Sequence, residues 1–516
     1  MTFEVLFYAR AFLLARLNDL AWKKDMARPN VVLINPPNPR NLVADRDAAG
    51  GFGVLRTKEQ IAFPPLTLLY SASVLERRRF PLRVLDCSAM NYDEKKAIKN
   101  CCSFEPRVAV VLTSTPTFNL DCSFARQLKK QSEEITLIMI GPMVRVFPTK
   151  TLNLSGADFG VLGEPENVLP DLIGCIHAHK SLVSMKGLVF RRSEGLVSTG
   201  DAPLLKNLDA LPYPAWHLLP YKRFFFTISS SRGCPYGCFY CPYVISQGLE
   251  YRFRSPENVV NEMRYLKERF GAKLIQFRDP TFSFLKERAK DICRLIMQKK
   301  VDVDWIVETR PETVDFELLG LLAKAGCCEM LLGVESGSKR ILDSMGRLLP
   351  KFSADAYLDH VRKIVERARS LGVVPLAFFM LGLPEENWDT ALATINFAKG
   401  LRTAVQFSIA SPYPGTKFSE MANSEGLISD SDLSKMDTYT CSVVRTRYLS
   451  TEDLERIVRR ANYEVRAQKG LETLARKNIR FLPMHFLHFL AVKDKVGFAK
   501  KGAYTITNLL KKKNRD

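Results

Sequence analysis

The chain has 516 residues, of which 46% are hydrophobic and 25% are charged. That length exceeds the roughly 150 residues of one ordinary domain and predicts several packed domains rather than a long disordered chain. Twelve cysteines are too few for a secreted disulfide scaffold, which favours reduced thiols and a cytoplasmic protein. The net charge of +20 suits an anionic partner, whether nucleic acid, an acidic lipid surface or a phosphorylated substrate, and equally suits a solvated basic surface.

The N-terminal segment, residues 1–27, is apolar but is interrupted by Glu4, Arg10 and Arg16. Because no small-residue cleavage site follows it, we expect an amphipathic segment and not a signal peptide. No stretch of the chain reaches the roughly 18 to 20 uninterrupted apolar residues that cross a bilayer.

Residues 28–190 alternate short apolar runs with helical patterns, beginning with the run 31–37 and a helix over 64–80. This βαβ alternation predicts an α/β domain with a Rossmann-like parallel sheet. Ligands of such sheets bind beyond the carboxyl ends of the strands. The residues expected around that crevice are Asn35, Asp86, Thr113, Ser114, Gly141 and Gly163, although each of them also suits a tight strand-to-helix turn.

Residues 191–221 lose this periodicity and predict a linker that carries Pro203, Pro212, Pro214 and Pro220. A second alternation of six strand-helix units fills residues 222–424. Its first helix begins at Ser255-Pro256, a capping hydroxyl followed by proline at the first helical position. Six units predict a partial (β/α)6 barrel of the TIM type, with its chemistry on the loops after the strands.

Residues 425–516 read as a basic, helical C-terminal extension. Its apolar stretch, residues 481–492, is too short to span a bilayer. This stretch could lie on a membrane surface, or it could dock against the barrel.

Three cysteines follow the first strand of the predicted barrel, in SRGCPYGCFYCPY. Cys234, Cys238 and Cys241 are spaced C-x3-C-x2-C, so their thiolates converge on one point. Three thiolates on a four-iron cluster leave one iron open for a small molecule. The alternative, a zinc site, needs a fourth ligand, and the nearest candidates are His217 in the linker and Cys293 in a helix.

This loop resembles the signature of the radical S-adenosylmethionine (SAM) superfamily, C-x3-C-x-aromatic-C, with Tyr240 as the aromatic residue. The stretches YRFRSPENVVNEM, FRDPTF, ETR, LLGVESGS, MLGLPEE and SPYPGTKF resemble the subfamily that carries an N-terminal cobalamin-binding domain. That subfamily includes the anaerobic magnesium-protoporphyrin ester cyclase and radical methylases. The resemblance spans roughly residues 30 to 425.

The resemblance implies a [4Fe-4S] cluster on the three cysteines, whose open iron chelates SAM, and one-electron cleavage of SAM to a 5′-deoxyadenosyl radical. It implies that Tyr240 packs on the adenine and that Glu335 accepts the ribose hydroxyls or the amino group, unless Glu335 is only a helix cap. Arg310 could meet a carboxylate and Asp279 could face substrate, or each could form an internal salt bridge. The residues expected to border the adenosine are Gly382, Pro384 and Glu385.

The first domain resembles the cobalamin-binding domain of this subfamily, and the resemblance implies that Asn35, Thr113, Ser114, Gly141 and Gly163 surround the cofactor. Gly141-Pro142-Met143 departs from the usual Gly-Gly-Pro-His, and no Asp-x-His-x-x-Gly motif is present. A bound cobalamin would therefore lack a histidine ligand below the cobalt.

The implied reaction is cobalamin-dependent methylation of an unactivated carbon in a small or lipid-like metabolite. Radical cyclisation, rearrangement or carbon–carbon bond formation without methyl transfer, and modification of RNA, are the alternatives. The resemblance also implies an external electron donor such as flavodoxin or ferredoxin. The basic, apolar ends of the chain allow peripheral contact with a membrane, whereas nucleic acid is not expected, because the C-terminal region lacks the small β-barrel that RNA-modifying relatives append.

Overall fold

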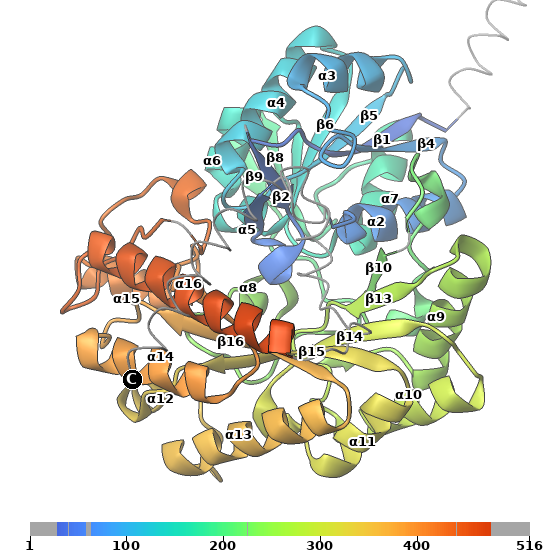
Figure 1. Ribbon diagram of the computed structural model, residues 1–516. Coiled ribbons are helices and arrows are strands. Elements are labelled where there is room, and N and C mark those ends of the chain that lie inside the picture. Colours follow the sequence, from blue (N-terminus) through green and yellow to red (C-terminus); the bar gives the residue numbers. More distant parts are fainter. Residues whose placement is uncertain are drawn as a thin grey trace, which may run out of the picture.

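The computed structural model describes residues 28–39, 41–57, 63–193, 195–223, 225–439 and 441–475. These residues form two α/β layers, each of which consists of one main β-sheet and the helices that pack on it (Figure 1). The amphipathic segment expected at residues 1–27 and the apolar stretch 481–492 lie outside the described residues. Among the described residues, no helix is both long and apolar enough to cross a membrane.

The first sheet has seven strands in the order β4-β1-β5-β6-β7-β8-β9. The first five in this order are parallel, as the alternation predicts, whereas β8 and β9 join as an antiparallel hairpin. The strands are β1 (Val31–Asn35), β4 (Leu82–Asp86), β5 (Val108–Leu112), β6 (Thr136–Ile140), β7 (Phe159–Val161), β8 (Leu188–Arg192) and β9 (Gly195–Ser198).

The helices of this layer are α2 (Leu66–Arg77), α3 (Glu94–Cys102), α4 (Phe118–Gln131), α5 (Pro142–Val146), α6 (Pro148–Ser155) and α7 (Pro165–His177). A separate hairpin, β2 (Leu42–Asp45) and β3 (Val54–Thr57), encloses the short 3-10 turn η1 (Ala48–Gly51). β9 carries the first sheet past residue 190, where the sequence predicts a linker, because buried β8 pairs with β7 and β9 pairs with β8.

The second sheet has six strands, all parallel and in chain order. They are β10 (Phe225–Ile228), β13 (Leu274–Phe277), β14 (Asp304–Thr309), β15 (Cys327–Glu335), β16 (Val374–Leu381) and β17 (Ala404–Ile409). The helices between them are α9 (Pro256–Phe270), α10 (Lys286–Gln298), α11 (Phe316–Lys324), α12 (Lys339–Ser344), α13 (Ala354–Ser370) and α14 (Trp388–Gly400). These strands confirm the six expected units, and within the described residues the sheet stays open, since β10 and β17 do not pair.

The two faces of β15 show how this sheet positions a site. Met330, Leu332 and Val334 are fully buried, whereas the alternate residues Gly333 and Glu335 are half-buried. Because successive side chains of a strand point to opposite faces, one face packs into the hydrophobic core and the other is left for polar groups. The predicted start of α9 is also confirmed, since the Ser255 hydroxyl accepts from the Asn258 amide at 3.2 Å.

One hydrophobic core runs through both layers. It includes Leu69 of α2 in the first layer and Phe226 and Trp305 in the second. Trp216, in the stretch predicted as a linker, is 3% exposed and makes an edge contact with Phe226, with ring centroids 5.0 Å apart. The predicted linker is therefore packed between the layers.

The C-terminal region is not helical from residue 425, contrary to the expectation. The described part of residues 425–450, which leaves out residue 440, contains one 3-10 turn, η5 (Leu433–Lys435), and one isolated bridge between Ile428 and Val444. Aspartate side chains bind the local backbone there: Asp430 accepts from the Asp432 amide at 2.8 Å and Asp432 from the Ser434 amide at 3.0 Å. Such local hydrogen bonds compete with helix formation.

The helix that follows, α16 (Thr451–Ala475), lies along β17 (Figure 1). Its Asn462 side chain accepts from the Phe407 amide at 2.9 Å and donates to the Phe407 carbonyl at 2.9 Å. An edge strand exposes unpaired backbone groups. α16 therefore covers and partly satisfies the edge at which the second sheet ends.

Candidate active site

The cysteine loop is a tight excursion between two short paired strands, β11 (Ser231–Arg232) and β12 (Arg252–Phe253), and it includes the short helix α8 (Tyr243–Gln247). Gly233 has φ +80°, and a Cβ there would collide with the carbonyl of Glu250. The Cys234 amide donates to the Gly248 carbonyl at 3.2 Å, and the Cys241 amide donates to the Cys238 carbonyl at 3.0 Å. Only glycine permits this close backbone approach at residue 233.

The three cysteines are free and half-buried, and they lie near one another. Burial raises the pKa of the Cys234 and Cys241 thiols, and the neighbouring Cys238 raises both further. Within the described residues, no three His, Cys, Asp or Glu side chains are already arranged as a metal site. The loop supplies three soft thiols, the donor type that iron–sulfur clusters use, but does not itself hold them in a metal-binding arrangement.

The fourth ligand that zinc requires is absent from the two positions considered for it. His217 binds Glu76, with Nε2 and Oε1 2.8 Å apart, and Cys293 is fully buried in the hydrophobic core of α10. A closed zinc site needs four protein ligands. The open three-thiol arrangement consequently fits a cluster better than structural zinc.

The stretch of chain that leads into the cysteine loop is held by buried polar groups. Asp279, fully buried, accepts from the Ser230 amide at 2.7 Å and from the hydroxyls of Ser230 and Ser231 at 2.5 and 2.6 Å. Arg288 donates to the Ser230 carbonyl at 2.8 Å, and Arg254 to the Ser229 carbonyl at 3.1 Å. Asp279 therefore supports, from inside, the chain that leads into the cysteine loop.

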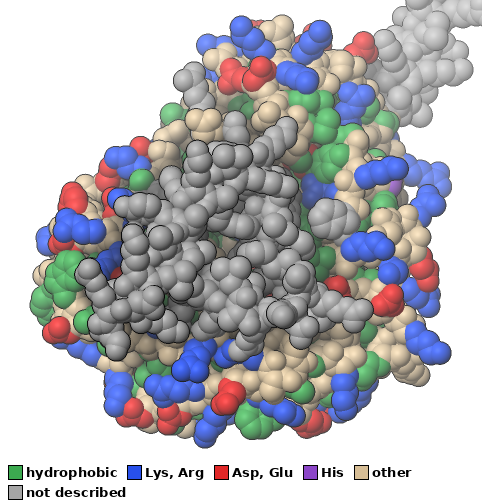
Figure 2. Space-filling model, viewed as in Figure 1, with side chains coloured by type: hydrophobic (Ala, Val, Ile, Leu, Met, Phe, Trp, Pro, Cys, Tyr) green, Lys and Arg blue, Asp and Glu red, His purple; other side chains and the backbone are tan. Residues whose placement is uncertain are grey.

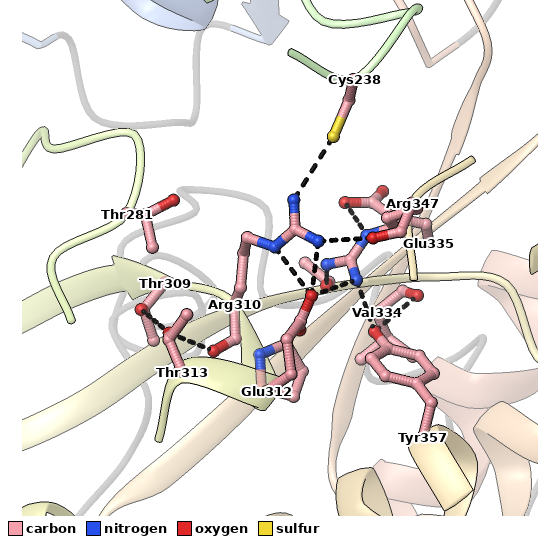
Figure 3. Close-up of polar contacts among 12 residues, drawn as sticks. Cys238, Thr281, Thr309, Arg310, Glu312, Thr313, Val334, Glu335, Arg347 and Tyr357 are labelled. Atoms are coloured by element: carbon pink, nitrogen blue, oxygen red, sulfur yellow. Dashed lines mark hydrogen bonds and ion pairs between the residues drawn. The ribbon is translucent and has the colours of Figure 1, made fainter. Parts of the chain in front are cut away.

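Arg310 lies beside Cys238 (Figure 3). It follows β14, is 7% exposed, and its Nη1 is 3.3 Å from Sγ of Cys238. Its Nε and Nη2 donate to the same carboxylate oxygen of Glu312, at 2.8 and 2.5 Å. Arg310 therefore forms the internal salt bridge considered as an alternative, with Glu312 as its partner. The same guanidinium also contacts Cys238, which the sequence predicts as a cluster ligand.

Glu335 ends β15 with φ +70°, an uncommon backbone conformation for a residue other than glycine. Its Oε1 is 3.7 Å from Nε of Arg347, and a Cβ at Gly333 would approach that oxygen to 2.7 Å. Burial raises the pKa of Glu335, opposed by Arg347, by Arg310 and by a hydrogen bond from Tyr240. The structure thus brings Tyr240, Glu335 and Arg310 together around the cysteine loop.

The loop after β16 contacts the C-terminal region. Gly382 has φ +103° and faces Leu454 of α16, the Pro384 carbonyl accepts from the Arg447 amide at 3.1 Å, and Glu385 forms ion pairs with Arg340, at 2.7 Å, and with Arg447. These contacts join the loop after β16 to the C-terminal region and, through Arg340, to α12.

A cavity of about 130 Å³ lies where the first sheet meets the cysteine loop. Gly141 and Gly163, from the carboxyl edge of the first sheet, line one side, and Tyr243, Ser246 and Gln247 of α8 line the other. A Cβ on Gly141, at φ +114°, would overlap the carbonyl oxygen of Thr113.

The other crevice residues predicted from the first sheet do not line this cavity. Asn35 donates to Asp86 at 2.8 Å and accepts from the buried Arg46 at 2.9 Å, and Ser114 contacts the Thr117 hydroxyl at 2.9 Å. Thr113 and Ser114 are both fully buried. The chain's own side chains thus fill the part of the crevice above β1 and β5.

A buried ion cluster joins the cavity to the cysteine loop, and sequence reasoning missed it. Glu164, after β7, accepts from Arg252 at 2.9 and 3.0 Å, lies 3.0 Å from Nη1 of Arg232, and accepts from the Leu205 amide at 2.8 Å. Arg232 also pairs with Glu166. The glutamates follow the first sheet, and the arginines flank the cysteines. Arg347 and Glu312 were also missed, since no local pattern separates them from surface charges.

Comparison with known proteins agrees with this geometry. The family model of the radical SAM superfamily matches residues 228–398. An uncharacterised methyltransferase of Pyrococcus horikoshii is 30% identical over 407 residues, which cover 77% of this chain and 86% of that protein. The anaerobic magnesium-protoporphyrin IX monomethyl ester cyclase of Synechocystis sp. is 25% identical over 69% of each chain.

Among solved structures, the radical SAM methyltransferase TsrM from Kitasatospora setae is similar, with a TM-score of 0.63 and 19% identity over 78% of this chain and 77% of that chain. TsrM has been solved with cobalamin and a [4Fe-4S] cluster bound, and with tryptophan substrate and a SAM analogue bound. The identity to the Pyrococcus methyltransferase over most of both chains, together with the matched family model, places this chain: it belongs to the radical SAM superfamily and is a radical SAM enzyme.

Proposed function

We propose that this enzyme is a cobalamin-dependent radical SAM methyltransferase acting on a small or lipid-like metabolite. One observation carries the proposal: the cavity at the carboxyl edge of the first sheet opens directly onto α8, the helix that follows the three cysteines. A cofactor in that cavity would therefore lie beside the radical-generating site.

Cys234, Cys238 and Cys241 would hold the [4Fe-4S] cluster, with Tyr240, Glu335 and Arg310 around the bound SAM. The six-stranded sheet would act as the partial TIM-type barrel, its half-buried face enclosing substrate. When bound, the reduced cluster and SAM supply a carbon radical that removes a substrate hydrogen, and cobalamin supplies a methyl group. The chain's own contribution is to position these groups and to exclude water.

The lining of the cavity suits a flat cofactor in part. Gly141 and Gly163 offer backbone without side chains, and among the described lining residues there is no histidine, in keeping with cobalamin that lacks a lower histidine ligand. The volume of about 130 Å³, however, is below the roughly 300 to 1,000 Å³ of typical ligand pockets. A Cβ on Gly50 would approach the Ser246 hydroxyl to 2.7 Å, so the η1 turn is packed on α8. A bound cobalamin would therefore need more room than this cavity offers.

The likeness to TsrM supports a small-molecule substrate, since TsrM is known with tryptophan bound. The half-buried face of the second sheet offers both apolar and polar side chains, including Phe378, Met380, Gln406 and Ser408. In the visible described surface of Figure 2, Lys and Arg are interspersed with Asp and Glu and form no single basic patch.

An external one-electron donor, such as flavodoxin or ferredoxin, would reduce the cluster. We further propose a cytoplasmic location with peripheral membrane contact through the terminal segments, which liposome flotation of the full chain would test. Flotation of a chain ending at residue 475 to the same extent as the full chain would count against a C-terminal contact.

The test of the main proposal is anaerobic purification followed by assay of iron, sulfide and cobalamin, with Cys238→Ala as the variant and Cys293→Ala, a buried cysteine outside the loop, as its control. We expect about four irons per chain in the wild type and in the control, loss of the cluster absorbance in Cys238→Ala, and deuterated product from methyl-deuterated SAM. An iron-loaded wild type without cobalamin or methyl transfer would favour a radical cyclisation, rearrangement or carbon–carbon bond formation instead. A Cys238→Ala variant that still forms 5′-deoxyadenosine would refute the cluster assignment.

A further inference from the structure

We propose that Arg310 raises the reduction potential of the cluster by donating a hydrogen bond to the Cys238 thiolate, and that Glu312 and Arg347 hold it in that position. This inference rests on the proposed function, since it takes Cys238 as a cluster ligand. It assigns Arg310 to the cluster itself, whereas the sequence suggests only a carboxylate partner for it.

The contacts of the Arg310 guanidinium leave one group for the thiol (Figure 3). Nε and Nη2 both donate to Glu312, and Nη2 also donates to the Arg347 carbonyl at 2.7 Å. Nη1 is 3.3 Å from Sγ of Cys238, and the guanidinium carbon lies 3.9 Å from the ring centroid of Tyr236. A planar guanidinium with two of its nitrogens engaged has a defined orientation, so Nη1 is aimed at the sulfur.

Glu312 is in turn held by a second arginine. Nη1 of Arg347 lies 3.1 Å from the same Glu312 oxygen and 3.0 Å from the Tyr357 hydroxyl, and Nη2 of Arg347 donates to the Gly333 carbonyl. Arg310, Glu312 and Arg347 are 7%, 5% and 3% exposed. Movement of Arg310 away from Cys238 would therefore leave a buried carboxylate short of a partner, which is costly.

Arg310 is the charged donor of this loop. Within the described residues, no other charged side chain is found hydrogen-bonded to the three thiols. The other donors are neutral: the backbone of Tyr236 and the Thr281 hydroxyl, 4.0 Å away, for Cys234, and the backbone of Tyr243 for Cys241. Reduction adds a negative charge to an iron–sulfur cluster, and hydrogen bonds to its sulfurs and the local charge set its potential. Because a buried cation is weakly screened, Arg310 favours the reduced cluster.

The experiment is an anaerobic redox titration of the reconstituted full chain without SAM, with the reduced cluster followed by electron paramagnetic resonance. The variants are Arg310→Gln, Arg310→Lys and Glu312→Gln, and Arg46→Lys is the control, a buried arginine of the first layer. We expect Arg310→Gln to titrate at least 59 mV lower than the wild type, a tenfold change in the one-electron equilibrium. Arg310→Lys, which keeps the charge but loses the fork, should shift less in the same direction, and Arg46→Lys should not shift. Glu312→Gln removes a buried negative charge beside Arg310 and should therefore titrate higher than the wild type.

The outcomes separate this inference from the function on which it rests. A wild-type chain that takes up no iron and sulfide would contradict the proposed function. If both Arg310 variants keep their full iron content and the wild-type reduction potential, the inference alone is overturned. The same holds if these variants keep that potential but bind SAM more weakly, a result that would assign Arg310 to the SAM carboxylate. If Arg310→Gln fails to hold a cluster, Arg310→Lys and Glu312→Gln decide the question by the same titration.

Discussion

Replacing Glu164 by glutamine tests whether the buried ion cluster holds the first sheet to the cysteine loop. The Glu164 carboxylate lies within 2.9 to 3.0 Å of nitrogens of Arg252 and Arg232, and all three side chains are nearly or fully buried. Removal of one partner from such a cluster typically costs about 3 to 5 kcal/mol, because the remaining charges stay buried without compensation. We therefore expect Glu164→Gln to lower the free energy of unfolding by about that amount.

The pH dependence follows from the same contacts. Burial alone would raise the pKa of Glu164, but Arg232 and Arg252 hold that pKa below its ordinary value of 4.5. A carboxylate with a lowered folded-state pKa contributes stability above the unfolded-state pKa and loses it as the pH falls through the folded-state pKa. The gap between wild type and Glu164→Gln should therefore be full at pH 7 and narrow below about pH 4.5.

The assay is equilibrium denaturation in urea of the apoprotein, with Asp171→Asn as the matched control. Asp171 lies on α7, close to Glu164 in the sequence, but its partner Arg78 is 3.4 Å away and both side chains are more than half exposed. Exposed pairs contribute about 0 to 1 kcal/mol. If Glu164→Gln and Asp171→Asn unfold at the same urea concentration, the cluster does not stabilise the fold as argued.

Three further substitutions test other parts of the structure. Gly141→Ala should destabilise the chain by about 1 to 3 kcal/mol, because the φ of +114° and the nearby Thr113 carbonyl leave no room for a Cβ. The control, Gly174→Ala in α7, has open space around the new Cβ and should not destabilise the chain. Equal denaturation midpoints for the two variants would count against the first-sheet geometry. Burial raises the pKa of Glu386 from 4.5 to about 7, opposed by Thr390 and the Gly382 backbone. Wild-type stability should therefore fall as the pH rises from about 4.5 to 7. Glu386→Gln should remove that loss, roughly 3 kcal/mol, and parallel pH profiles would contradict it. Asp279→Asn weakens the hydrogen-bond acceptor for Ser230 and Ser231, and each such hydrogen bond to a charged group is worth about 1.5 to 3 kcal/mol. The variant should therefore bind less iron per chain. An iron content equal to that of the wild type would show that the cysteine loop does not need these hydrogen bonds.

The succession along the chain of most strands and helices follows from local pattern, whereas β9, in the predicted linker, does not. Hydrophobic periodicity predicts elements such as β1, β5 and the six strands of the second sheet. Two adjacent residues, Ser255 and Pro256, predict the start of α9. The spacing of Cys234, Cys238 and Cys241 is equally local, so the loop and its place after the first strand of the second sheet are predictable. The expectation fails at residues 425–450, where aspartate side chains bind the nearby backbone and prevent a helix.

Contacts between distant elements depend on packing and have no sequence period. The residues around Arg310 do not indicate that its side chain lies 3.3 Å from the sulfur of Cys238, 72 residues earlier. Nor do the residues around Glu164 indicate that it binds Arg252, 88 residues later. Strand-end position places Asn35, Ser114, Gly141 and Gly163 at one edge, yet only the two glycines line the cavity, because Arg46 binds Asn35 and the hydroxyl of Ser114 is bound to Thr117. The sequence determines the elements and the radical-forming loop, and the tertiary structure decides which charges and which strand ends surround it, since those pairings arise only when the two sheets pack together.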